Sequence, residues 1–196
     1  MELKNINQID KAATANRFEL LRFGTALFFL VCIMLYIELQ PPVEGSKIML
    51  VIAAMIGGYM ALNIGANDVA NNVGPAVGSR AMTLGGAIII AAIFESSGAL
   101  IAGGDVVSTI KKGIIDPAQV TDTDTFIWLM MAALLAAALW LNLATASGAP
   151  VSTTHSIVGG VLGAGIAAGG IGIANWSKMG AIAASWVISP VLGGII

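Results

Sequence analysis

Two short polar stretches separate long apolar runs in this chain, and their residue types could bind ions of opposite charge. The first, "NIGANDVANNVGPAVGSR", covers residues 63–80. It supplies asparagine amides, one carboxylate and, where its glycines and proline interrupt a helix, free backbone carbonyls. These are hard oxygen ligands, which suit a small hard cation better than a soft metal. The stretch therefore predicts a cation site, and an aqueous loop rich in Asn and Gly is the alternative.

The spacing within this first stretch forms two pairs. Asn67 and Asn71 are four residues apart, as are Asp68 and Asn72, so each pair would share one face of a helix.

The second stretch, "PVSTTHS" at residues 150–156, predicts a break followed by a new helix. Proline is favoured in the first turn of a helix, and Ser or Thr caps such a start. Free amides and the positive end of the helix dipole would then face a bound anion. The four hydroxyls of Ser152, Thr153, Thr154 and Ser156 would add groups that both donate and accept hydrogen bonds. The alternative is that these hydroxyls only bond helix backbones.

Charge balance connects the two stretches. Residues 148–160 contain no Lys or Arg, so an anion held there would depend on dipoles and hydroxyls. An uncompensated anion inside a membrane is costly, and a co-bound cation would offset that cost. The two stretches are therefore interpreted as partners, one for a cation and one for an anion.

Two titratable residues are candidates for coupling the two ions. Glu95 lies inside an apolar run, where a carboxylate is a functional hypothesis by default. His155 could carry protons near neutral pH. The alternatives are a structural hydrogen bond for Glu95 and a packed, hydrogen-bonded ring for His155.

Other classes of protein are disfavoured. The chain has one histidine and one cysteine, which give no dedicated metal site, and it has no G-x-S-x-G motif. A net charge of −2 argues against a nucleic-acid partner. We therefore expect no enzyme activity, no cofactor, and no metal beyond a transported hard cation.

Composition predicts an all-α membrane protein. Of its 196 residues 57% are hydrophobic and 10% charged, whereas a soluble domain is about 25% charged. The apolar runs are long enough for helices that span about 30 Å of hydrocarbon. We expect six spans, with broken or re-entrant helices and a polar loop over 103–125. The six runs cover residues 22–39, 47–64, 81–102, 126–146, 157–173 and 179–196.

Glycine spacing and basic residues add two expectations. Gly159 and Gly163, then Gly165 and Gly169, repeat the spacing typical of close helix packing. Residues 1–22 hold four of the nine Lys and Arg, which favours a cytoplasmic N-terminal tail.

Three ordered motifs resemble the inorganic phosphate transporter (PiT) family. They are "GANDVANNVGPAVGSRAMT" (65–83), "IFESSGALIAGGDVVSTIKKGIID" (93–116) and "PVSTTHSIVGG" (150–160). The resemblance covers residues 48–196, which would form the first transmembrane repeat. Residues 23–47 would be an additional helix and loop. Asn72, Val73 and Pro75 depart from the family pattern.

The resemblance implies a secondary transporter in the cell (inner) membrane that carries inorganic phosphate with Na⁺ or H⁺. Asn67, Asp68 and Asn71 would then belong to the cation side, and Ser152, Thr153 and Thr154 to the phosphate side. Glu95 matches the family's membrane glutamate. A permease for another oxyanion such as sulfate, or a passive anion pore, is the alternative.

Family members have two inverted halves with the site between them, and this chain holds one copy of each signature. We therefore expect a truncated sequence that lacks the second repeat, or else a half that pairs as a homo-oligomer.

Overall fold

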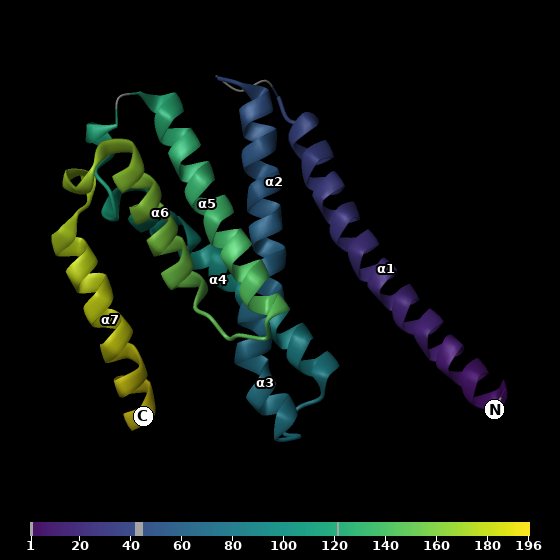
Figure 1. Ribbon diagram of the computed structural model, residues 1–196. Coiled ribbons are helices and arrows are strands. Elements are labelled where there is room, and N and C mark those ends of the chain that lie inside the picture. Colours follow the sequence, from purple (N-terminus) through teal and green to yellow (C-terminus); the bar gives the residue numbers. More distant parts are fainter. Residues whose placement is uncertain (1, 42–44, 121) are drawn as a thin grey trace. The chain divides into compact units, whose positions relative to one another are not determined.

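The computed structural model describes the backbone of residues 2–41, 45–120 and 122–196, and side chains in these ranges except those of residues 2–16, 111 and 112. The chain forms two compact units, Met1–Leu62 and Asn63–Ile196. Figure 1 shows the helices α1 to α7.

The first unit contains α1 (Glu2–Glu38) and most of α2 (Lys47–Ile64). Residues 2–22, expected as a tail, form the first part of α1, because no Gly or Pro interrupts them. The helix ends at Glu38, before Pro41. Residues 42–44, which fall in the segment predicted as an additional helix and loop, lie outside the described residues.

Two contacts join α1 and α2 in this unit. Lys47 Nζ lies 2.9 Å from Glu38 Oε2 and donates to the Glu38 carbonyl at 2.7 Å. Both side chains are largely exposed, so the ion pair contributes at most about 1 kcal/mol. Gly58 packs against Ile33, and a Cβ at this position would collide with that side chain. The absence of a side chain at Gly58 therefore permits the close approach.

The second unit begins with the last two residues of α2, and a π-helical turn, Gly65–Val69, follows directly. The helices α3 (Ala70–Gly78), α4 (Leu84–Gly113), α5 (Thr123–Ala146), α6 (Thr153–Gly169) and α7 (Trp176–Ile195) follow. Short 3₁₀ turns at Pro117–Gln119 and Ile171–Ile173 connect them. No β-strand occurs among the described residues, which confirms the all-α prediction.

The interruption of regular helix predicted for 63–80 occurs as a π turn, and the chain stays helical through Pro75. The expectation of a loop over 103–125 was wrong in its first part, which is helical as far as Gly113. Its apolar residues Val106, Ile110 and Ile114 recur every four positions, so the helix keeps one apolar stripe despite the neighbouring polar residues.

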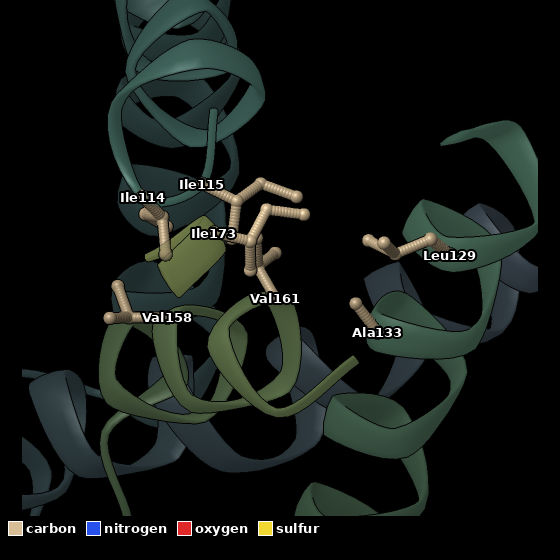
Figure 2. Close-up of a cluster of buried hydrophobic side chains, with 7 residues drawn as sticks. All are labelled: Ile114, Ile115, Leu129, Ala133, Val158, Val161 and Ile173. Atoms are coloured by element: carbon tan, nitrogen blue, oxygen red, sulfur yellow. The ribbon is translucent and has the colours of Figure 1, made fainter. Parts of the chain in front are cut away.

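A buried apolar cluster holds α6 against its neighbours in this unit. Figure 2 shows side chains of α6 directed toward those of the segments that follow α4 and precede α7. The cluster consists of Ile114, Ile115, Leu129, Ala133, Val158, Val161 and Ile173. An antiparallel bridge between Ile115 and Ala174 fixes the base of the cluster. Because lipid is as apolar as these side chains, dense packing rather than water exclusion favours their association.

Glycine packing follows the predicted pattern at one of its two pairs. A Cβ at Gly165 would collide with the Ile115 side chain, and one at Gly169 with the Ile173 side chain. Among the described residues, no atom lies within 4 Å of a Cβ placed at Gly159 or Gly163, so this pair makes no close approach. Gly160 instead lies so close to α5 that a Cβ there would approach the Ala133 carbonyl oxygen to 2.6 Å.

Five helical segments among the described residues are long and apolar enough to cross a membrane: Arg17–Glu38, Lys47–Gly78, Leu84–Ile110, Thr123–Ala146 and Trp176–Ile195. The fifth of the six expected spans, residues 157–173, corresponds to α6, whose 17 residues reach about 25 Å, shorter than a typical hydrocarbon core. These helices indicate that the chain is a multi-pass membrane protein.

Candidate functional site

The end of α5 positions the polar loop that precedes α6. Gly148 has φ of 70°, a left-handed conformation that glycine adopts at little cost. Its N–H donates to the Thr145 carbonyl at 3.1 Å, and the Ala149 N–H donates to the Ala144 carbonyl at 2.8 Å. This pair of bonds is the Schellman ending of a helix. It turns the chain sharply, so that residues 149–152 lead directly into α6.

Ser152 caps α6, as predicted from the sequence. Its Oγ accepts a hydrogen bond from the His155 N–H at 3.3 Å, and Thr153 is the first helical residue. Ser156 Oγ donates to the Ser152 carbonyl at 2.8 Å. The first-turn amides of Thr153 and Thr154 have no partner within the helix, as at any helix start. Thr154 is exposed, so its amide is available to a ligand, whereas Thr153 is buried.

The three predicted anion ligands occupy different environments. The Ser152 hydroxyl serves the cap, while Thr154 is exposed. The Thr153 side chain is 7% exposed, and its Oγ1 has no hydrogen-bond partner among the described residues. An unpaired buried hydroxyl costs about 1–3 kcal/mol, so Thr153 is a costly residue for stability alone.

A groove of about 760 Å³ runs along the first turn of α6, between α4 and α7. Its polar lining comes from all three helices, and its floor is apolar. The polar lining residues are Asp105 and Thr109 of α4, Ser152, Thr154 and His155 around the start of α6, and Ser185 and Ser189 of α7. The groove is large enough for a small oxyanion with some of its water.

His155 joins α6 to α7. Its ring lies 3.8 Å from the Trp186 ring, centroid to centroid, at an interplanar angle of 44°. It also lines the groove beside Ser152. The ring thus packs as the structural alternative expected, while it remains within reach of a molecule in the groove.

Asn67 connects the two polar stretches, which lie about 80 residues apart in sequence. It is 5% exposed in the π turn. Its Nδ2 donates to Thr145 Oγ1 and to the Ala149 carbonyl, each at 3.2 Å. Its Oδ1 accepts from Asn71 Nδ2 at 3.0 Å and from the Val151 N–H at 3.4 Å. Asn67 therefore holds the loop that leads into α6.

The remaining predicted residues are not brought together at the groove. Asn71 is exposed and reaches Asn67 one turn away, as its spacing predicted. Asp68 is half-buried in the π turn. Glu95 is exposed on α4, ten residues or about 15 Å before Asp105, and does not line the groove.

Two residues at the site were missed from the sequence. Thr145 was not predicted as a partner of the polar stretches because it lies at the end of an apolar run. Asp105 was placed in a loop, and the continued stripe of Val106 and Ile110 would have placed it on a helix.

Comparisons with known proteins agree with this architecture. A model of the phosphate transporter family matches residues 64–196. A protein of Helicobacter pylori named "Putative phosphate permease" is 53% identical over all 196 residues. A protein of Pyrococcus horikoshii, also named as a putative phosphate permease, is 49% identical over 146 residues, which are 74% of this chain and 36% of that protein.

A solved structure described as "The sodium-dependent phosphate transporter" is 48% identical, with a TM-score of 0.72 over 76% of this chain and 37% of that one. The chain spans 37% of the length of the Helicobacter relative. Since the family model covers most of the chain, this protein belongs to the phosphate transporter family.

Proposed function

We propose that this chain carries the first half of a site that transports inorganic phosphate across the cell (inner) membrane together with Na⁺ or H⁺. The observation that carries the proposal is the open first turn of α6. It presents the amide and hydroxyl of Thr154 to a groove of anion size, and the buried, unpartnered Thr153 hydroxyl lies one residue away from that lining. Sidedness follows the basic residues, with the N-terminus in the cytoplasm.

The lack of basic side chains around the groove supports coupling of the anion to a cation. No Lys or Arg lines the groove among the side chains that the structure describes. Dipoles and hydroxyls would therefore hold the anion, and a co-transported cation would offset its charge. Asp68 and the carbonyls of the π turn are the candidate ligands, since π turns recur at functional sites.

Asn67 has a narrower part in this proposal than a simple ligand. Its Oδ1 already accepts two N–H bonds, from Asn71 and Val151. A cation at this oxygen competes with both donors. Asp68 and Asn71 therefore remain the more accessible cation ligands, and Asn67 positions the anion loop.

Phosphate uptake into proteoliposomes that contain the complete protein tests the proposal. We expect saturable accumulation that depends on an imposed Na⁺ or H⁺ gradient, and Asp68→Asn should weaken that dependence. Equilibration of phosphate without accumulation would instead support a passive pore.

Thr153→Val tests the anion seat against a purely structural role. The change removes an unpartnered hydroxyl at nearly constant volume, so the melting temperature should stay constant or rise, while the phosphate concentration for half-maximal uptake rises roughly tenfold. Thr123→Val at the first residue of α5, which is exposed, is the matched control. Unchanged kinetics in Thr153→Val would remove this hydroxyl from the seat.

A further inference from the structure

Asp105 is the one carboxylate among the described residues that line the groove beside the first turn of α6. It lies on α4, one turn before Thr109, whose Oγ1 donates to the backbone carbonyl of Asp105 at 3.0 Å. That bond uses the main chain of Asp105 and leaves its carboxylate exposed at the groove. A negative charge here is unexpected in a site for an anion, because it repels the ligand unless a proton lies between them.

The chemistry of the two common tetrahedral oxyanions resolves this conflict. An ionised carboxylate only accepts hydrogen bonds. Phosphate near neutral pH carries at least one proton, so it can donate an O–H to Asp105 while its other oxygens accept from the α6 amides. Sulfate carries no proton at this pH, so it would oppose two acceptors of like charge. A site built to bond a ligand hydroxyl strongly rejects the analogue that lacks it.

We propose, on the basis of the phosphate seat proposed above, that the Asp105 carboxylate accepts a hydrogen bond from phosphate and thereby excludes sulfate from the groove. Asp105 is then a specificity-determining residue rather than a source of binding energy for every oxyanion. The proton stays on phosphate throughout, and no covalent bond is made or broken.

The other groups around the groove do not supply this discrimination. His155 of α6 is the second titratable side chain among the described lining residues, and its protonated form attracts phosphate and sulfate alike. The lining residues of α7 are uncharged, and Ser189 can donate or accept toward either anion. Selection against an unprotonated oxyanion therefore falls to Asp105.

Competition between the two anions tests the proposal. The complete protein is reconstituted in proteoliposomes, and the concentration of sulfate that halves uptake of labelled phosphate is divided by the half-saturating concentration of phosphate. Asp105→Asn retains the shape but adds a donor, so this ratio should fall roughly tenfold or more. Asp105→Glu keeps an acceptor and should keep most of the discrimination. Asp124→Asn, an exposed carboxylate on α5 away from the groove, should match the wild type.

Three results would overturn the assignment. An unchanged ratio in Asp105→Asn removes Asp105 from selection. A changed Na⁺ or H⁺ dependence with unchanged sulfate competition assigns Asp105 to the cation instead. If Asp105→Asn abolishes uptake, calorimetric binding of phosphate and sulfate to the purified variant replaces transport, and loss of both without a relative gain of sulfate contradicts the proposal. If the wild-type protein transports phosphate and Asp105→Asn leaves the competition ratio unchanged, only the assignment of Asp105 fails. If the wild-type protein does not transport phosphate, the proposed function itself fails.

Discussion

The π turn around Asn67 and the first turn of α6 are both polar, yet they use their polar atoms in opposite ways. Asn67 satisfies its donors and acceptor inside the protein, with partners at Thr145, Ala149, Asn71 and Val151. In the first turn of α6, the Ser152 hydroxyl caps the helix, while the Thr153 hydroxyl has no partner among the described residues. A saturated polar cluster fixes geometry, whereas an unsaturated one retains the capacity to bind a ligand. The difference separates a positioning residue from candidate ligands.

Replacement of Asn67 tests the polar cluster whose hydrogen bonds are all made within the protein, and it should have the largest effect on stability. Asn67→Ala removes four hydrogen bonds at a buried position, so we expect the free energy of unfolding to fall by about 2–4 kcal/mol. Thermal unfolding of the purified protein in detergent measures the loss. Asn71→Ala removes only the bond to Asn67 from an exposed side chain and should cost less than about 1 kcal/mol. Equal losses in the two variants would contradict the distinction.

Gly148 lies where the two regions join, because its turn delivers the Ala149 carbonyl to Asn67. Gly148→Ala places a Cβ in the left-handed region and should cost about 1–2 kcal/mol. Gly159→Ala is the control, since open space surrounds it within α6 and alanine favours helix. Chemical denaturation of both variants should therefore give shifts of opposite sign, and a stabilised Gly148→Ala would mean that the turn does not constrain the loop.

Two substitutions of Ser152 separate the cap from the open seat. Ser152→Ala should lose about 1 kcal/mol of stability with the cap. Ser152→Asp caps equally well, but its charge faces the groove. Its melting temperature should match the wild type while the half-saturating phosphate concentration rises at least about tenfold. Normal uptake by Ser152→Asp would place the anion elsewhere.

Asp122 provides a cap outside the groove for comparison and should show the smallest effect. The Thr125 N–H, and then its hydroxyl, lower the pKa of Asp122 below its usual value. The folded state therefore binds the proton more weakly than the unfolded chain. Its stabilising effect is present above the unfolded pKa of about 3.9 and is lost as pH falls through the lower folded pKa.

A pH series of unfolding curves checks this effect. Asp122→Asn caps without a charge, so it should lose less stability than the wild type between about pH 4 and pH 2. The Ser152 cap carries no titratable group and should contribute equally across that range. Identical acid profiles for Asp122→Asn and the wild type would contradict the prediction.

Local chemistry could be predicted from the sequence to the extent that it depends on neighbours. The capping of α6 by Ser152 and the contact between Asn67 and Asn71 follow from residue type and spacing, and the structure confirms both. The helical class followed from the long apolar runs. The assignment of ions to these residues stays a prediction.

Long-range partners could not be predicted in the same way. No periodicity connects Asn67 to a loop about 80 residues away, so its role as a clamp emerged only in three dimensions. The π turn was read as a break because glycine and proline signal both irregular loops and widened helices. Asp105 was misplaced for a related reason, since two glycines and a carboxylate outweighed the apolar stripe that continues through α4.

The π turn also restricts how the length of this segment can change. Its five residues, Gly65–Val69, occupy a turn that an ordinary helix closes with fewer. Deletion of one residue there would replace the π turn with an ordinary α turn, and the residues after it would keep nearly the same face of the helix. The deletion would instead remove the wide turn itself, whose backbone carbonyls are candidate cation ligands. Between relatives that share the site, we therefore expect substitutions in this segment but no gaps when their sequences are aligned.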